Sequence, residues 1–276
     1  MPAQTIVQGL AYINWTVLLS LALGSFALVA ICGELTDATR GYLRFTAFCS
    51  GLLGLVTLAA DLGLPEPAGL AIAPAADGDL YRRIALAAFV GGTIVYAVAV
   101  GRGTRRRASA IVAFGSGAAA MALAAFGWTG GLTGGVPLLV QFGILAAVTG
   151  GCLAAVILGH WYLVTPRLSE RPLVLATRLL TAGIAIQLGL FVIWVSLGSR
   201  PVTTPFAALA GSTALLVWLR LVVGLAFPLV LSMMATRTAR TRSMESATGL
   251  LYIDLAAIAS GTIVASGLYY AFGLLV

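Results

Sequence analysis

The chain has 276 residues, of which 60% are hydrophobic and 9% charged, and its net charge is +7. Because a water-soluble domain carries roughly a quarter charged residues, this composition excludes an ordinary water-facing surface. Long apolar runs instead predict helices that cross a lipid bilayer, since each spanning segment must satisfy its own backbone hydrogen bonds. The basic residues occur in short clusters between apolar runs, which is typical of membrane topology signals and argues against nucleic-acid binding.

Eight apolar segments are each long enough to cross a bilayer at about 1.5 Å of rise per residue. The sequence therefore predicts an all-α, polytopic membrane bundle of about eight transmembrane helices, in a single domain that covers residues 1–276. The predicted spans are 11–33, 43–63, 84–101, 109–128, 136–159, 174–197, 208–235 and 247–274.

Arginines gather on alternate loops, after the first, third, fifth and seventh predicted spans. Because positively charged loops stay in the cytoplasm, these loops are predicted to be cytoplasmic and both termini to lie outside. All 16 basic residues are arginine, and alanine, glycine and leucine are abundant. This composition is typical of a GC-rich bacterial genome, so the expected location is a bacterial plasma (inner) membrane. The clustered arginines are Arg40, Arg44, Arg102, Arg105, Arg106, Arg107, Arg167, Arg171, Arg178, Arg237, Arg240 and Arg242.

Two weak similarities predict an internal duplication into half-repeats, residues 1–128 and 136–276. GSFALVAICGE at 24–34 resembles GGCLAAVILGH at 150–160. The arginine-rich GRGTRRRASAIVAFGSG at 101–117 resembles ATRTARTRSMESATGLL at 235–251. Chance similarity between apolar segments is the competing explanation. In a 4+4 parallel repeat each half keeps its orientation, so the pseudo-twofold axis runs along the membrane normal.

The single histidine, His160, lies at the end of the fifth predicted span, and the repeat pairs it with Glu34. Histidine gains and loses a proton near neutral pH. Together with the nearby Tyr162 and Arg167, these two residues are therefore candidates for a quinone or proton-linked site. The alternative is that His160 and the aromatic residues beside it anchor the helix end among lipid headgroups.

Two charged residues lie inside predicted spans. Arg220 is about two turns from the outer end of the seventh span, and Asp254 is about two turns from the inner end of the eighth. Charges inside a bilayer are costly and imply a partner or a function. Their predicted depths differ by about 6 Å, so we expect an ion pair, or else a proton-accessible Asp254 that lines a cavity. Asp61, near the end of the second span, is expected to be only interfacial.

Motifs for catalysis and metal binding are missing from the sequence. It contains no HExxH, GxSxG or Walker A motif, and a single histidine excludes a bis-histidine haem within one chain. No catalytic residue and no metal ligand is therefore predicted, no cofactor is certain, and enzyme activity stays open.

Three classes of function remain. The first is a membrane-embedded subunit of a bacterial respiratory or redox assembly, with quinone as candidate cofactor and other redox subunits as candidate partners beside the lipid bilayer. The second is a secondary transporter for a small solute, with Arg220 and Asp254 as its midplane site. The third is a membrane-integral assembly factor or enzyme. Short loops and eight spans suit the first class best, because such a subunit leaves the chemistry to its partners.

Overall fold

The computed structural model describes residues 7–73, 78–104, 107–165, 168–198 and 204–276. In these ranges the chain is helical, without strands, so the predicted all-α class is confirmed. Eight helical rods are long and apolar enough to cross a membrane, as predicted. The helices are α2 (Leu10–Leu35), α3 (Arg40–Leu62), α4 (Asp79–Arg102), α5 (Arg107–Thr129), α6 (Leu132–Val164), α7 (Arg171–Leu197), η1 (Ala207–Leu209), α8 (Ala214–Leu221), η2 (Val222–Ala226), α9 (Phe227–Arg240) and α10 (Met244–Phe272).

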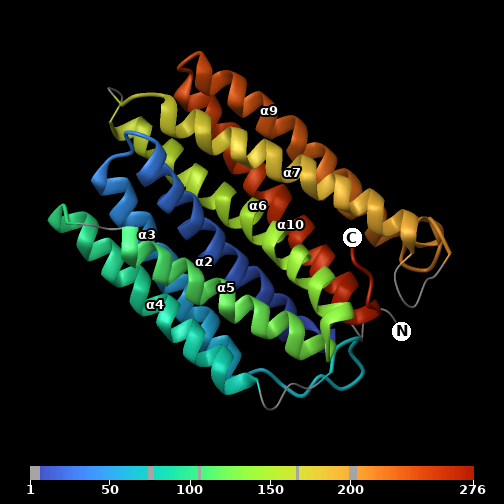
Figure 1. Ribbon diagram of the computed structural model, residues 1–276. Coiled ribbons are helices and arrows are strands. Elements are labelled where there is room, and N and C mark those ends of the chain that lie inside the picture. The colour runs from blue at the N-terminus through green and yellow to red at the C-terminus, as the bar shows by residue number, and fades with distance from the viewer. Residues whose placement is uncertain (1–6, 74–77, 105–106, 166–167, 199–203) are drawn as a thin grey trace.

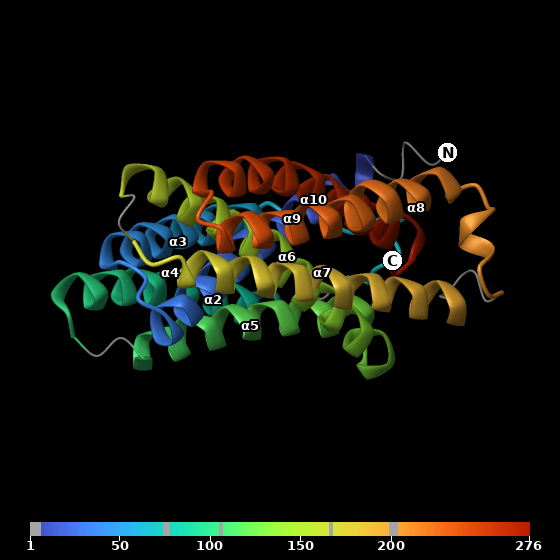
Figure 2. The same cartoon turned by 90° about the horizontal axis from the view of Figure 1, so that it is seen from above.

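The helices run side by side along one long axis (Figure 1). The start of α2 and the C-terminal residue Val276 lie at the same end of the bundle, called here the terminal end. The opposite end, called the arginine end, holds the α2–α3, α4–α5, α6–α7 and α9–α10 connections. One rod contains three elements, because α8 and α9 are joined by the π-helix η2 and continue in one direction (Figure 2).

Helices α2 and α6 form the centre of the bundle, since 67% and 72% of their most apolar windows are buried, against 44% or less in the other rods. Their backbones touch at two glycines. A Cβ atom added to Gly24 would lie 1.7 Å from the carbonyl oxygen of Ala146, and one added to Gly150 would lie 2.4 Å from that of Ser20. Only glycine permits this approach, which is how membrane helices commonly pack closely.

The other helices surround this central pair. Helices α3, α4 and α5 pack against one another in chain order beside α2, and α7, α9 and α10 do so beside α6. Their outward faces carry many exposed apolar side chains, among them Phe48, Leu52, Ile94, Val112 and Ile186. A surface of this kind is suited to lipid rather than water and indicates a multi-pass membrane protein.

Candidate functional site

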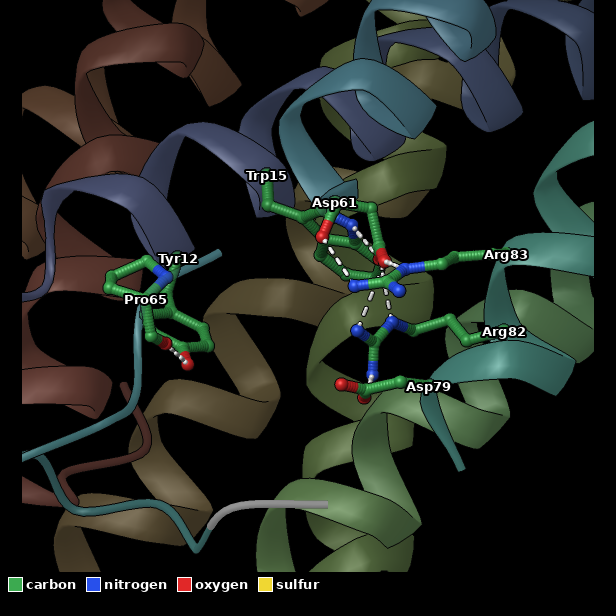
Figure 3. A network of polar contacts seen from close by, with 7 residues as sticks. All are labelled: Tyr12, Trp15, Asp61, Pro65, Asp79, Arg82 and Arg83. Atoms are coloured by element: carbon green, nitrogen blue, oxygen red, sulfur yellow. Dashed lines mark hydrogen bonds and ion pairs between the residues drawn. The ribbon is translucent and has the colours of Figure 1, made fainter. Parts of the chain in front are cut away.

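A polar cluster near the terminal end is centred on Asp61, in the last turn of α3 (Figure 3). Its Oδ2 atom accepts hydrogen bonds from Trp15 Nε1 at 2.8 Å and Arg82 Nε at 2.6 Å. Its Oδ1 atom accepts from Arg82 Nη2 at 3.1 Å and Arg83 Nε at 3.0 Å. Asp61 is fully buried, so the expectation that it is only an interfacial residue is wrong in one respect: donors from α2 and α4 enclose the carboxylate.

The guanidinium group of Arg82 also has a partner for each of its nitrogen atoms. Its Nη1 atom donates to Asp79 Oδ1 at 2.7 Å, and its guanidinium carbon lies 5.4 Å from the centre of the Trp128 ring. Every guanidinium nitrogen of Arg82 thus donates to a carboxylate. The cluster ties α2, α3, α4 and α5 together at the terminal end. Its satisfied bonding indicates a structural role.

A second buried arginine, Arg220, lies in the last turn of α8 and is 1% exposed. Its Nη1 atom donates to the carbonyl oxygen of Gly224 at 3.3 Å, whereas Nε and Nη2 have no hydrogen-bond partner. The guanidinium lies where the rod crosses α10. A Cβ atom added to Gly261 would be 2.8 Å from Arg220 Nη1 and 2.5 Å from the Cα atom of Gly224. Two glycines therefore make room for the side chain.

Asp254 on α10 is fully buried, and neither carboxylate oxygen has a hydrogen-bond partner. The expected ion pair between Asp254 and Arg220 is not formed. Arg220 meets α10 at Gly261, which is two helical turns, or about 10 Å of rise, beyond Asp254. Similar predicted depth did not predict a contact, because Arg220 packs against α10 at Gly261, two turns away from Asp254.

The surroundings of Asp254 are a helix interface. Thr149 and Thr262 share a hydrogen bond of 2.7 Å between α6 and α10. Closer to the arginine end, Cys152 Sγ of α6 lies 3.8 Å from the carbonyl oxygen of Leu251 of α10. Along α10, Asp254 therefore lies between two polar contacts to α6, yet it takes part in neither.

The described residues of the predicted histidine site lie on two helices, α2 and α6. His160 is exposed at the arginine end of α6, and Tyr162 is buried, with its hydroxyl donating to the carbonyl oxygen of Ser169. Arg167 lies outside the described residues. Glu34 lines a pocket of about 620 Å³ whose wall is built from α2, α4 and the ends of α3 and α5. His160 does not line this pocket. The neighbouring Gly159 packs against Thr248 of α10.

Metal binding finds no support in the part of the chain that the structure describes, where no group of three or more His, Cys, Asp or Glu side chains is placed to hold an ion. Comparison with protein-family models, curated proteins and solved structures finds no match to this chain.

Proposed function

We propose that the protein is a multi-pass protein of a bacterial inner membrane, with its arginine end in the cytoplasm and both termini outside. The described cluster arginines support this orientation, because they lie in or beside the connections of the arginine end (Figure 1). Positively charged loops are retained on the cytoplasmic side.

We also propose that the bundle arose by duplication of a four-helix unit, giving an N-terminal half (α2–α5) and a C-terminal half (α6–α10). The central contact supports this, because it is reciprocal: Gly24 approaches Ala146, and Gly150 approaches Ser20. In the similarity between 24–34 and 150–160, Gly24 is the counterpart of Gly150, and the same spacing makes Ser20 the counterpart of Ala146. Reciprocal contacts are what a twofold axis between the halves requires.

The helix neighbours give further support. The packed pairs α2–α3, α3–α4 and α4–α5 have counterparts in α6–α7, α7–α9 and α9–α10. Contacts between the halves correspond as well, since α5 packs on α6 and α10 packs on α2. A pseudo-twofold axis through the α2–α6 contact relates each of these pairs to its counterpart.

The burial pattern supplies the register of the proposed repeat. The buried positions of α3 recur in α7, and those of α5 recur in α10. The buried positions of α4 recur in the α8–α9 rod, where one residue is added across η2. A π-helix turn holds one extra residue, which explains the shift. Buried counterparts include Leu43 and Leu173, Thr57 and Gln187, Asp61 and Phe191, Arg82 and Arg220, Thr93 and Ser232, Val100 and Ala239, Gly117 and Asp254, and Ala124 and Gly261.

This register differs from the second sequence similarity, which pairs Gly117 with Leu251. Burial along the rest of the helix favours Asp254 as the counterpart of Gly117. The buried Met121 and Ala125 then match the buried Ile258 and Thr262, whereas the sequence similarity matches them with the half-buried Leu255 and Ala259. The described arginines that drew the two segments together are exposed and lie in or beside the α4–α5 and α9–α10 connections, where residues are free to shift by a turn: Arg102, Arg107, Arg237, Arg240 and Arg242.

We infer that the protein is a secondary carrier for a small solute, with its binding and proton-accessible groups in the C-terminal half. One observation carries this: Arg220 and Asp254 are buried and lack ionic partners, whereas the related positions in the N-terminal half are the paired Arg82 and an uncharged glycine. Uncompensated charges inside a bilayer are costly, so they mark function by default.

The test uses proteoliposomes on a solid-supported membrane, where solute-driven charge movement is recorded. Pulses of gluconate, lactate, phosphate, choline and glycine at constant ionic strength cover the main charge classes. At least one solute should give a current above that of protein-free vesicles, and Asp254→Asn should abolish or strongly reduce it. Asp37→Asn, an exposed acid at the arginine end, is the matched control. No current from any solute, or equal currents from wild type and Asp254→Asn, would contradict the carrier.

The second candidate is the membrane subunit of a respiratory or redox assembly that interacts with quinone. The observation that favours it is the exposure of His160 at the cytoplasmic end of α6 in the proposed topology, where a partner subunit has access. Native mass spectrometry of the protein from its own host tests this. Retained redox subunits or quinone would support the assembly, and a bare monomer or homodimer would favour the carrier. No described contact favours an assembly factor or enzyme.

A further inference from the structure

The two buried arginines use the same guanidinium edge differently. In Arg82, the Nε and Nη2 atoms face the Oδ2 and Oδ1 atoms of Asp61 at 2.6 and 3.1 Å. This is the bidentate geometry in which arginine binds carboxylates most strongly. In Arg220, Nε and Nη2 are the two atoms without a partner. The free edge of one arginine is thus the carboxylate-binding edge of the other.

The C-terminal half retains the guanidinium but has apolar side chains at the counterparts of both acids. In the proposed register, Phe191 takes the place of Asp61, and Val217 takes the place of Asp79. Phe191 and Val217 are buried in one apolar cluster with Leu225, which follows Arg220 along the same rod. The protein therefore supplies no carboxylate where the related half supplies two.

The counterpart of Trp15 does not face Arg220 with a free polar group either. Gln141 of α6 corresponds to Trp15, which donates to Asp61 in the N-terminal half. Gln141 Nε2 instead donates to the main-chain oxygen of Val276 at 2.8 Å. The polar group that would orient a carboxylate is thus bound elsewhere, and the Nε and Nη2 atoms of Arg220 are left without an acceptor.

Chemistry and local structure both favour a ligand over a passive role. An arginine side chain does not lose its proton in a protein, so burial cannot neutralise Arg220 as it can a lysine or an acid. The helix becomes a π-helix at Val222, directly after the turn that carries Arg220, and such turns are frequent at functional sites.

We infer that Arg220 binds the carboxylate of a small solute through Nε and Nη2, in the way that Arg82 binds Asp61. The inference rests on the proposed carrier function for its purpose, because the bound carboxylate is then the transported group. Binding itself requires only the geometry of Arg220. Phosphate offers the same paired oxygens, so the experiment must separate the two anions.

The experiment measures ligand binding to the full chain in lipid nanodiscs, by isothermal titration calorimetry and thermal unfolding. Sodium acetate and sodium lactate are the carboxylate probes, with sodium phosphate and sodium chloride as comparison anions at equal ionic strength and pH. We expect saturable binding of at least one carboxylate and none of chloride. Arg220→Gln should weaken it by roughly tenfold or more, since two charge-assisted hydrogen bonds are lost. Arg220→Lys should also weaken it, because lysine lacks the planar fork. Arg44→Gln, at an exposed helix start, should leave it unchanged.

A second variant, Phe191→Asp, keeps the test sharp if Arg220→Gln does not fold. It places a carboxylate at the counterpart of Asp61, so it should occupy Arg220 and abolish carboxylate binding while the arginine is still present. Carboxylate binding that survives in Arg220→Gln or Phe191→Asp would overturn the inference, and so would a preference for phosphate. Transport of some solute without carboxylate binding would also overturn it and leave the carrier intact. Binding lost in these variants, without transport of any solute, would support the site and remove the carrier.

Discussion

The two halves of the bundle each bury one arginine near the terminal end, and the two arginines differ in everything except burial. Arg82 donates to two carboxylates and lies over an indole ring, whereas Arg220 has one bond to a backbone carbonyl and two free nitrogens. Under the proposed duplication, one copy of the site has been completed by acids and the other has not. Burial of a charge is therefore poor evidence of its role, and its set of partners is the better guide.

The comparison also separates stability from function within a single fold. A completed cluster depends on its buried ion pair, because removing either Asp61 or Arg82 leaves the other charge buried without that partner. An incomplete cluster leaves hydrogen-bond donors free for a ligand, and removing its charge should not lower the stability of the fold.

Asp61→Ala should be strongly destabilising. It removes the acceptor of hydrogen bonds from Trp15, Arg82 and Arg83 and leaves a buried guanidinium with only Asp79. Breaking a buried ion pair in this way costs about 3–5 kcal/mol of unfolding free energy. Unfolding in mixed detergent–SDS micelles measures the loss. A change below about 1 kcal/mol would mean that the cluster is not structural.

Gly24→Leu and Gly150→Leu test the contact between the halves. Each added side chain meets a backbone carbonyl of the partner helix, so α2 and α6 must move apart, at about 1–3 kcal/mol or more. Because the contacts are reciprocal, the two substitutions should have similar effects. Gly91→Leu is the matched control, since a Cβ atom there meets nothing within 4 Å. Equal stability of all three variants in the same SDS titration would remove this support for a twofold axis.

Hydropathy predicted the eight rods because a run of about 20 apolar residues has few alternatives to a membrane helix. It did not predict the Asp61 cluster, because the donors come from Trp15, 46 residues earlier, and Arg82, 21 residues later. The pairing of Arg220 with Asp254 failed for a related reason. Depth along a helix follows from residue counting, but the level at which two helices cross depends on small residues such as Gly224 and Gly261, whose contacts appear only in three dimensions.

Arg220→Leu should leave stability unchanged or raise it by about 1–2 kcal/mol, opposite in sign to Asp61→Ala. The substitution removes a buried charge that has no ionic partner and places an apolar side chain beside Val217 and Leu225. The same SDS titration measures it, with Arg82→Leu as the paired comparison that should destabilise. A large loss in Arg220→Leu would mean that the free nitrogens are satisfied within the fold, and the contrast between the two arginines would disappear.

The smallest effect is expected where a charge pair is exposed. Arg242 Nη1 lies 2.8 Å from Glu170 Oε2 at the arginine end, with side chains 54% and 38% exposed. Surface ion pairs contribute about 0–1 kcal/mol, because water and salt screen them. Arg242→Gln should therefore change the unfolding free energy by less than about 1 kcal/mol, and less still at high salt. A loss comparable with that of Asp61→Ala would show that distance, rather than burial, decides the strength of ion pairs in this protein. The difference between Arg82 and Arg220 would then need an explanation other than the desolvation of their charges.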